Sequence, residues 1–179
     1  MARIFAAIPL DGGVAEAFGT LMTGLDGARW TPPERLHLTL RFAGELADDE
    51  VARLRAALAE VRSPPVRIEL AGVGSFDLGR GRGAVWAGVR DEAQLLQLQA
   101  QCEAAARQAG LTPDERVWLP HVTVGYTSRP SPGSVDGWIA RSHGFQAGPF
   151  EAPGFGLYES VRTGGELAYR LVQSYQLAA

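Results

Sequence analysis

Two tetrapeptides of the same form, His37-Leu38-Thr39-Leu40 and His121-Val122-Thr123-Val124, constrain the fold of this 179-residue chain more than any other feature. They contain two of its three histidines. Side chains alternate between the two faces of a β-strand, so the histidine and threonine of each motif share one face and the two apolar residues share the other. The pattern predicts two strands that each present an imidazole and a hydroxyl to a site and bury an apolar pair.

The composition predicts one globular domain over residues 1–179. Apolar residues make up 46% of the chain and charged residues 21%, which is ordinary for a soluble domain, and the length is sufficient for a substantial core. The net charge of −3 argues against a broad basic surface that would hold nucleic acid through its backbone alone. A nucleic-acid substrate would therefore have to be held locally.

Residue types that are rare or absent exclude several kinds of chemistry. The chain has no lysine, which excludes a P-loop lysine, a Schiff base and a lysyl-nucleotide intermediate. Its one cysteine, Cys102, lies in an apolar helical pattern that predicts buried packing, without an internal disulfide. We expect no membrane span, because no apolar run approaches about 20 residues, and no signal peptide. These features predict a cytoplasmic protein.

Hydrophobic periodicity predicts the same order in both halves: strand, helix, motif strand, helix, strand. In the first half the expected elements are a strand at 3–8, a helix at 14–22, the motif strand at 36–42, a helix from 48 that ends before 63–65, and a strand at 66–70. In the second half they are a strand at 84–89, a helix at about 92–109, the motif strand at 117–126, a helix at 134–140, and strands at 145–150, 155–158 and 169–175.

This repeated order predicts the fold class. We expect an α+β fold, duplicated and two-lobed with pseudo-twofold symmetry, in which antiparallel sheets line a central cleft and helices lie outside. The whole chain would form a single domain of two intertwined lobes. The motif strands would meet at the cleft, where sites commonly lie.

The duplicated scaffold with two His-x-Thr-x motifs resembles the 2H phosphoesterases. Three stretches are similar to the RNA 2′,3′-cyclic phosphodiesterase branch, also called 2′-5′ RNA ligase: residues 3–9, residues 29–45, and residues 157–160 with 169–171. The resemblance implies hydrolysis of RNA or nucleoside 2′,3′-cyclic phosphates to 2′-phosphates, with the substrate as partner and no cofactor. It departs from the branch at Gly125-Tyr126, where an arginine commonly follows a small residue; Arg129 or Arg41 could supply the missing charge.

Two histidines can perform this reaction without a metal. Each has an ordinary pKa near 6.5, so one can act as general base and the other as general acid. We predict His121 as the base and His37 as the acid, with Thr39 and Thr123 donating hydrogen bonds to the phosphate oxygens. Arg41 has the same strand parity and is a predicted phosphate contact, with a rim salt bridge as the alternative.

Other residues favour structural interpretations. Core packing is favoured over base stacking for Trp30, Phe76 and Trp86, and His143 is expected at the surface. The arginine- and glycine-rich run 79–83 could form a basic loop over RNA or a solvated connection. A zinc site is disfavoured, because the chain has one cysteine and no short spacing between histidines.

Two further functions stay open. The same acid and base could run the reverse reaction, which is ATP-independent 2′-5′ RNA ligation, although hydrolysis should prevail in water unless the ends are held together. The chain could also be a non-catalytic module that binds a nucleotide or an RNA end.

Overall fold

The computed structural model describes residues 1–10, 12–90 and 93–178. The strands are β1 (Ala2–Pro9), β2 (Ala28–Trp30), β3 (His37–Leu46), β4 (Val66–Gly79), β5 (Arg82–Val89), β6 (His121–Ser128), β7 (Gln146–Ala152), β8 (Gly154–Thr163) and β9 (Glu166–Gln176). The helices are α1 (Gly12–Ala15), α2 (Asp48–Leu58), α3 (Ala93–Gln108) and α4 (Ser134–Ser142), with 3-10 helices η1 (Glu16–Thr20) and η2 (Pro33–Arg35).

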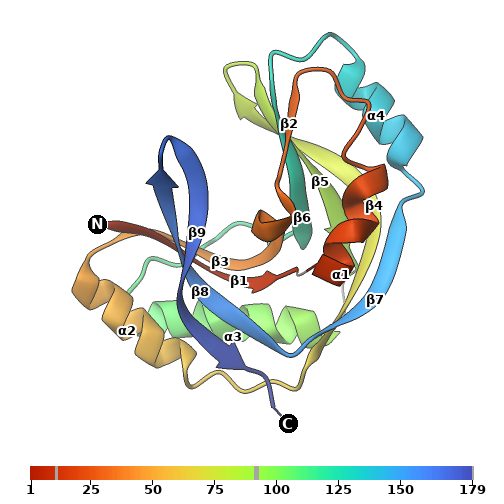
Figure 1. The fold of residues 1–179 in the computed structure, drawn as a ribbon. Helices are drawn as coiled ribbons and strands as arrows, with labels where there is room; N and C mark the ends of the chain where they lie inside the picture. Colours follow the sequence, from red (N-terminus) through yellow and green to blue (C-terminus); the bar gives the residue numbers. More distant parts are fainter. Residues whose placement is uncertain (11, 91–92, 179) are drawn as a thin grey trace.

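All strand pairs are antiparallel, and the strands follow the order β7-β4-β5-β6-β3-β1-β8-β9, with β2 paired to β6. The two motif strands, β3 and β6, are neighbours in the middle of this order, where Leu38 pairs with Val122. We call β3, β1, β8 and β9 lobe 1, and β6, β2, β5, β4 and β7 lobe 2. Figure 1 shows the two lobes diverging from the motif strands.

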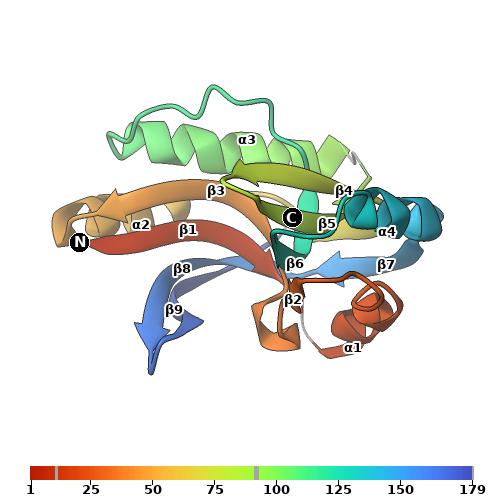
Figure 2. The same cartoon turned by 90° about the horizontal axis from the view of Figure 1, so that it is seen from above.

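Each lobe is covered by helices from both halves of the chain. Helices α2 and α3 lie side by side along lobe 1, and α4 lies beside β4 in lobe 2 (Figures 1 and 2). Gln99 of α3 donates to the Leu40 carbonyl of β3 at 3.5 Å, and Trp138 of α4 donates to the Leu21 carbonyl at 2.9 Å. Among the described residues, the helices are too short or too polar to cross a membrane.

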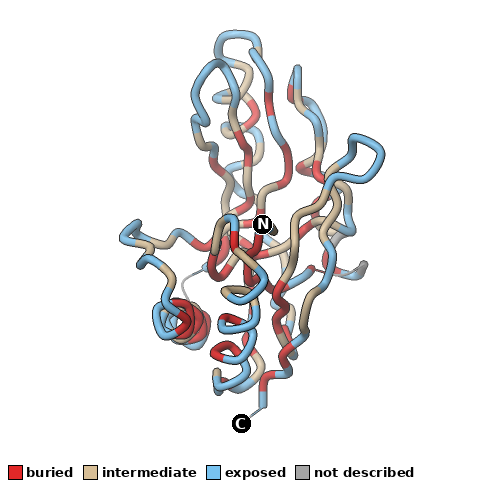
Figure 3. The backbone as a smooth tube through the Cα atoms, turned by 90° about the vertical axis from the view of Figure 1, so that its left-hand side faces the viewer, coloured by how far each residue is buried: buried red, intermediate tan, exposed pale blue. Residues whose placement is uncertain are grey.

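The apolar residues of the motifs anchor both strands in the core. Leu38, Leu40, Val122 and Val124 are at most 1% exposed, and Figure 3 shows that buried backbone concentrates in the strands and on the inner sides of helices. Cys102 is also fully buried, as predicted, and burial raises the pKa of its thiol to about 12. A thiol with this pKa remains protonated and unreactive near neutral pH.

The predicted α+β class with an antiparallel sheet is confirmed, while several boundaries were wrong. The expected helix at 14–22 is the short α1 followed by η1, consistent with the low helix propensity of Gly13 and Gly19. Strand β6 starts at His121 rather than 117, because Pro120 cannot donate to a sheet ladder. Strand β2 was missed altogether. The expected helix start at Glu92 lies outside the described residues.

Candidate active site

A cleft of about 770 Å³ lies between the lobes and is lined by β1, β3, β8 and β9 of lobe 1 and by β2, β4, β5 and β6 of lobe 2. Three of the predicted site residues, His37, Thr39 and Thr123, line it directly. His121 lies close enough for its charge to lower the pKa of His37. The structure therefore brings together the histidines and threonines of both motifs.

The two imidazoles are held in the same way. Nδ1 of His37 lies 2.7 Å from the carbonyl oxygen of Arg35, and Nδ1 of His121 lies 2.7 Å from that of Leu119, two residues earlier in each case. A carbonyl oxygen can only accept, so each Nδ1 carries a proton and donates it. In both rings Nε2 is therefore the nitrogen left to accept or donate a proton in chemistry.

Prolines that precede each motif help to position these carbonyl acceptors. Before β3, the backbone N–H of Leu36 closes a turn on the Pro33 carbonyl at 3.1 Å and leaves the Arg35 carbonyl for His37. Before β6, Pro120 favours an extended conformation at Leu119, whose carbonyl then accepts from His121. The local sequence thus fixes the imidazole tautomer as well as the start of each strand.

The surroundings of His37 are aromatic. Its ring centroid lies 5.1 Å from Phe5 and 5.1 Å from the edge-on ring of Tyr169. Burial lowers the pKa of His37 most, the hydrogen bond to Arg35 raises it, and the nearby His121 lowers it further; the net pKa is below 6.5. Repulsion between the rings disfavours double protonation, which suits a pair that divides the roles of acid and base.

His121 lies against aromatic rings of lobe 2. Its centroid is 4.9 Å from Phe76 and 6.0 Å from Trp86. Burial lowers its pKa below the ordinary value, although the hydrogen bond to the Leu119 carbonyl raises it. Phe76 and Trp86 therefore pack against the histidine at half-buried positions outside the hydrophobic core, so the predicted core packing is wrong for these two residues.

A β-bulge follows the motif in β3. Thr39 and Arg41 pair with consecutive residues of β1, which leaves Leu40 as the extra residue. A bulge of this kind reverses the alternation of side chains. Arg41 is consequently buried on the helix-covered side, while Phe42 is 37% exposed and lines the cleft.

The prediction that Arg41 contacts the phosphate is wrong, because this bulge turns it away from the cleft. Its side chain is 8% exposed, its Nε lies 2.5 Å from a Glu103 carboxylate oxygen, and it donates to the Thr112 carbonyl at 2.6 Å and to the Phe42 carbonyl. Burial acts to raise the pKa of Glu103, but Arg107, the Asp114 backbone and Arg41 together hold it below its usual value. Arg41 therefore fastens β3 to α3 through a buried ion pair.

A bulge at the same position follows the motif in β6. Thr123 and Gly125 pair with consecutive residues of β5, which leaves Val124 as the extra residue. Tyr126 consequently lines the cleft and is 40% exposed. At Gly125 a Cβ would lie 2.7 Å from the Trp30 ring, so this position requires glycine. Trp30 itself packs toward Trp138 at 6.4 Å, in line with its predicted core role.

The cleft is positively charged although the protein is acidic. Four arginines line it, and the lining residues that the structure describes include no carboxylate. The arginines are Arg3, Arg29, Arg82 and Arg162. Sequence reasoning missed Arg3, Arg29 and Arg162, because they come from three strands that only the sheet order brings together, and it considered Arg82 only as part of a basic loop. Arg129, the proposed substitute for the missing arginine, is exposed and does not line the cleft.

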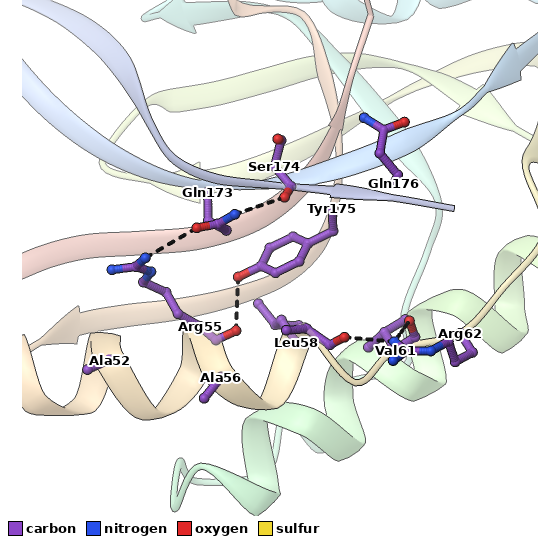
Figure 4. Close-up of a pocket in the computed structure, with 11 residues that line it drawn as sticks. Ala52, Arg55, Ala56, Leu58, Val61, Arg62, Gln173, Ser174, Tyr175 and Gln176 are labelled. Carbon is purple, nitrogen blue, oxygen red and sulfur yellow. Dashed lines mark hydrogen bonds between the residues drawn. The ribbon is translucent and has the colours of Figure 1, made fainter. Parts of the chain in front are cut away.

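A second groove, of about 540 Å³ between α2 and β9, provides a contrast. Figure 4 shows that its arginines are bonded within the protein. Arg55 donates to Gln173 at 3.2 Å, and Arg62 donates to the Ala59 and Val61 carbonyls at 2.7 and 3.0 Å. The described residues that line this groove include no histidine and no threonine. Across residues 1–10, 12–90 and 93–178, groups of three or more metal-ligating side chains are also absent.

This fold and site define a 2H phosphoesterase, in which two histidines from duplicated motifs meet at one cleft. A model of the 2′-5′ RNA ligase superfamily matches residues 21–140, and the chain belongs to this family.

Sequence relatives agree with this assignment. The RNA 2′,3′-cyclic phosphodiesterase of Archaeoglobus fulgidus is 31% identical over 165 residues, covering 90% of this chain and 92% of that protein. The protein of the same name from Geobacillus stearothermophilus is 32% identical over 126 residues, covering 67% of this chain but only 40% of that protein.

Solved structures share the fold. Escherichia coli LigT complexed with 3′-AMP has a TM-score of 0.78 at 23% identity, with 99% of both chains covered. The Thermus thermophilus protein TT0787 has a TM-score of 0.76 at 24% identity, with 98% of this chain and 97% of that chain covered. The arrangement of the two lobes is therefore shared with these proteins.

Proposed function

We infer that this protein is an RNA 2′,3′-cyclic phosphodiesterase that opens the cyclic phosphate of an RNA end or a nucleoside to a 2′-phosphate. The observation that carries this inference is the pair of imidazoles, each with Nε2 left for proton transfer, beside one arginine-lined cleft. Relatives bearing this name and solved LigT complexes with 3′-AMP, NADP⁺ and ATP support a substrate that is a nucleotide or an RNA end.

The histidines divide the proton transfers. His121 takes a proton from water, the water oxygen bonds to phosphorus as the bond to the 3′ oxygen breaks, and His37 gives its proton to that oxygen. His37 is assigned as the acid because it lines the cleft, where the bound phosphate anion favours its charged form. The phosphate stays on the 2′ oxygen, and both proton transfers are completed without a metal or another cofactor.

The remaining polar groups of the cleft stabilise negative charge. Thr39 and Thr123 line it from equivalent positions on the two motif strands, where their hydroxyls can donate to the two non-bridging oxygens. The arginines that line the cleft offset the charge of the phosphate, and the described lining residues include no carboxylate that would oppose them.

A cytoplasmic location agrees with an RNA substrate and with the free, buried Cys102.

The reverse reaction, 2′-5′ ligation, is the second candidate. A cleft of about 770 Å³ lined by both lobes favours it, because ligation needs room for a nucleotide on each side of the phosphate. Incubating RNA halves with cyclic phosphate and 5′-hydroxyl ends, without any nucleoside triphosphate, would yield a joined product only if ligation occurs.

Hydrolysis of an oligoribonucleotide ending in a 2′,3′-cyclic phosphate, in EDTA and with 2′- and 3′-phosphate products resolved, tests the proposed function. We expect formation of the 2′-phosphate alone. Absence of turnover between pH 5 and 8, where histidines titrate, would contradict hydrolysis and favour the binding module.

A further inference from the structure

The arginines of this chain fall into groups according to their partners. Eight pair with carboxylates: Arg41, Arg53, Arg62, Arg67, Arg90, Arg107, Arg116 and Arg170. Four others donate to backbone carbonyls or to glutamine: Arg35, Arg55, Arg141 and Arg162. Within the described parts of the chain, the side chains of five form no hydrogen bond or ion pair: Arg3, Arg29, Arg80, Arg82 and Arg129.

These five arginines are not scattered over the surface. Arg3, Arg29 and Arg82 line the cleft. Arg80 lies at the tip of the β4–β5 hairpin, and Arg129 is adjacent to it, since its backbone N–H donates to the Gly81 carbonyl at 2.6 Å. A chain with 20 acidic residues leaves these guanidinium groups without carboxylate partners, which points to an anion supplied from outside.

Four of the five follow one edge of lobe 2, around Tyr126. Tyr126 pairs with Arg29 of β2, and Arg82 of β5 pairs with Ser128 two residues further along β6. Residues that pair directly across strands point to the same face, so Arg29 flanks the exposed ring of Tyr126 and Arg82 lies further along the edge. We call Arg29, Arg80, Arg82, Tyr126 and Arg129 the lobe 2 rim.

Lobe 1 differs at the equivalent position. Phe42 follows its motif as Tyr126 follows the other, but the Arg3 guanidinium lies over the Phe42 ring at 5.0 Å from its centroid. One aromatic face of Phe42 is therefore covered by a guanidinium, whereas the exposed ring of Tyr126 forms no such contact within the described parts of the chain.

We propose that the lobe 2 rim binds the RNA strand upstream of the terminal nucleotide, an inference that rests on the proposed function. The base of the penultimate nucleotide stacks on Tyr126, since an aromatic face accepts any base. The upstream phosphates contact Arg29 and Arg82 and then Arg80 and Arg129. The preferred substrate is consequently an RNA strand rather than a mononucleotide. Tyr126 stacks on a base at the position where the RNA 2′,3′-cyclic phosphodiesterase branch commonly has an arginine.

Binding to a product end separates this inference from catalysis. Fluorescence anisotropy would compare a labelled tetraribonucleotide ending in a 2′-phosphate with a nucleoside 2′-phosphate used as competitor. For the unsubstituted protein we expect the tetranucleotide to bind at least about tenfold more tightly, since stacking of one base alone provides about that factor. Equal affinities would overturn the proposal.

Three variants localise the effect. Tyr126→Leu should lose about tenfold in tetranucleotide affinity, while Tyr126→Phe, which keeps the ring, should retain it. The double variant Arg80→Gln/Arg129→Gln should lower the slope of log affinity against log salt by about 1.4, as expected for two phosphate contacts on a single strand. The matched control is Arg53→Gln/Arg62→Gln on the far side of lobe 1, which removes the same charge and should leave the slope unchanged.

The outcomes are distinguishable from those for the proposed function. An unchanged slope and affinity in the rim variants, or the same loss in the control, would overturn the rim as the RNA-binding surface. Tight binding of the tetranucleotide with no hydrolysis of the cyclic phosphate would leave the rim intact and contradict only the catalytic function.

Discussion

The motif strands β3 and β6 share their chemistry and differ in what anchors them. In both, the histidine donates Nδ1–H to the carbonyl two residues earlier, and a bulge follows the threonine. Beyond the bulge, β3 carries Arg41 in a buried ion pair with α3, whereas β6 carries Gly125 beneath the Trp30 ring. The pseudo-symmetry thus extends to the groups that face the cleft, while the buried side of each strand is stabilised by its own means.

The comparison also applies to the histidines themselves. His37 lies between Phe5 and Tyr169 and lines the cleft, whereas His121 lies against Phe76 and Trp86. The same donor geometry in different surroundings allows one imidazole to be neutral while the other is charged. The two strands are therefore equivalent in how they hold the imidazole and different in what surrounds it.

The largest expected effect tests the equivalence of the histidines. His37→Ala and His121→Ala should each lower kcat by about 10²- to 10⁴-fold, and the double variant should be little worse than either, because the pair acts as a unit. Single-turnover hydrolysis of the cyclic phosphate measures this. His143→Ala is the matched control, since His143 is exposed at the end of α4 and should retain full activity. Near-normal turnover in either single variant would contradict the claim that both histidines are needed for catalysis.

The next effect should appear in stability rather than in turnover. Arg41→Leu leaves Glu103 partly buried without one of its partners, which should cost about 3–5 kcal/mol or somewhat less, because Arg107 still bonds Glu103. Denaturant unfolding measures the loss, and kcat per folded molecule should stay within about threefold. Unchanged stability combined with weaker substrate binding would indicate that Arg41 contacts the substrate in the cleft.

A smaller stability effect is expected on the other strand. Gly125→Ala places a Cβ 2.7 Å from the Trp30 ring and should destabilise the fold by about 1–3 kcal/mol through overpacking. Gly19→Ala, where a Cβ meets no atom within 4 Å, is the control in the same denaturant titration. A Gly125→Ala variant as stable as this control would show that the β6 bulge does not depend on the indole.

The smallest effect is a shift in pH dependence. Burial lowers the pKa of both histidines below 6.5, so kcat/KM, which reports the free protein, should decline on the alkaline side with a pKa below 6.5 as His37 loses its proton. A bound phosphate anion raises the pKa of His37, so the alkaline decline of kcat should lie at higher pH than that of kcat/KM. Coincident profiles would contradict contact between His37 and the phosphate.

Sequence periodicity predicted the order of elements and the convergence of both motifs, because alternation and helical spacing record which side chains are buried. The alternation of side chains along β3 predicted the wrong face for Arg41, because Leu40 is an extra residue in a bulge. A bulge can be recognised only from the pairing with the partner strand, here β1. The same bulge on β6 places Tyr126 in the cleft. Arg3, Arg29 and Arg162 were missed since they belong to strands joined only by tertiary pairing.

The central claim is that His37 and His121 act as acid and base on one phosphate, and the pH profile of kcat/KM for the residual activity of each His→Ala variant tests it most directly. With an oligoribonucleotide 2′,3′-cyclic phosphate in EDTA, the unsubstituted protein should give a bell-shaped profile. His121→Ala should lose the acid limb, where the base becomes protonated, and His37→Ala should lose the alkaline limb, where the acid is deprotonated. A bell-shaped profile that persists in either variant would contradict the acid–base pair.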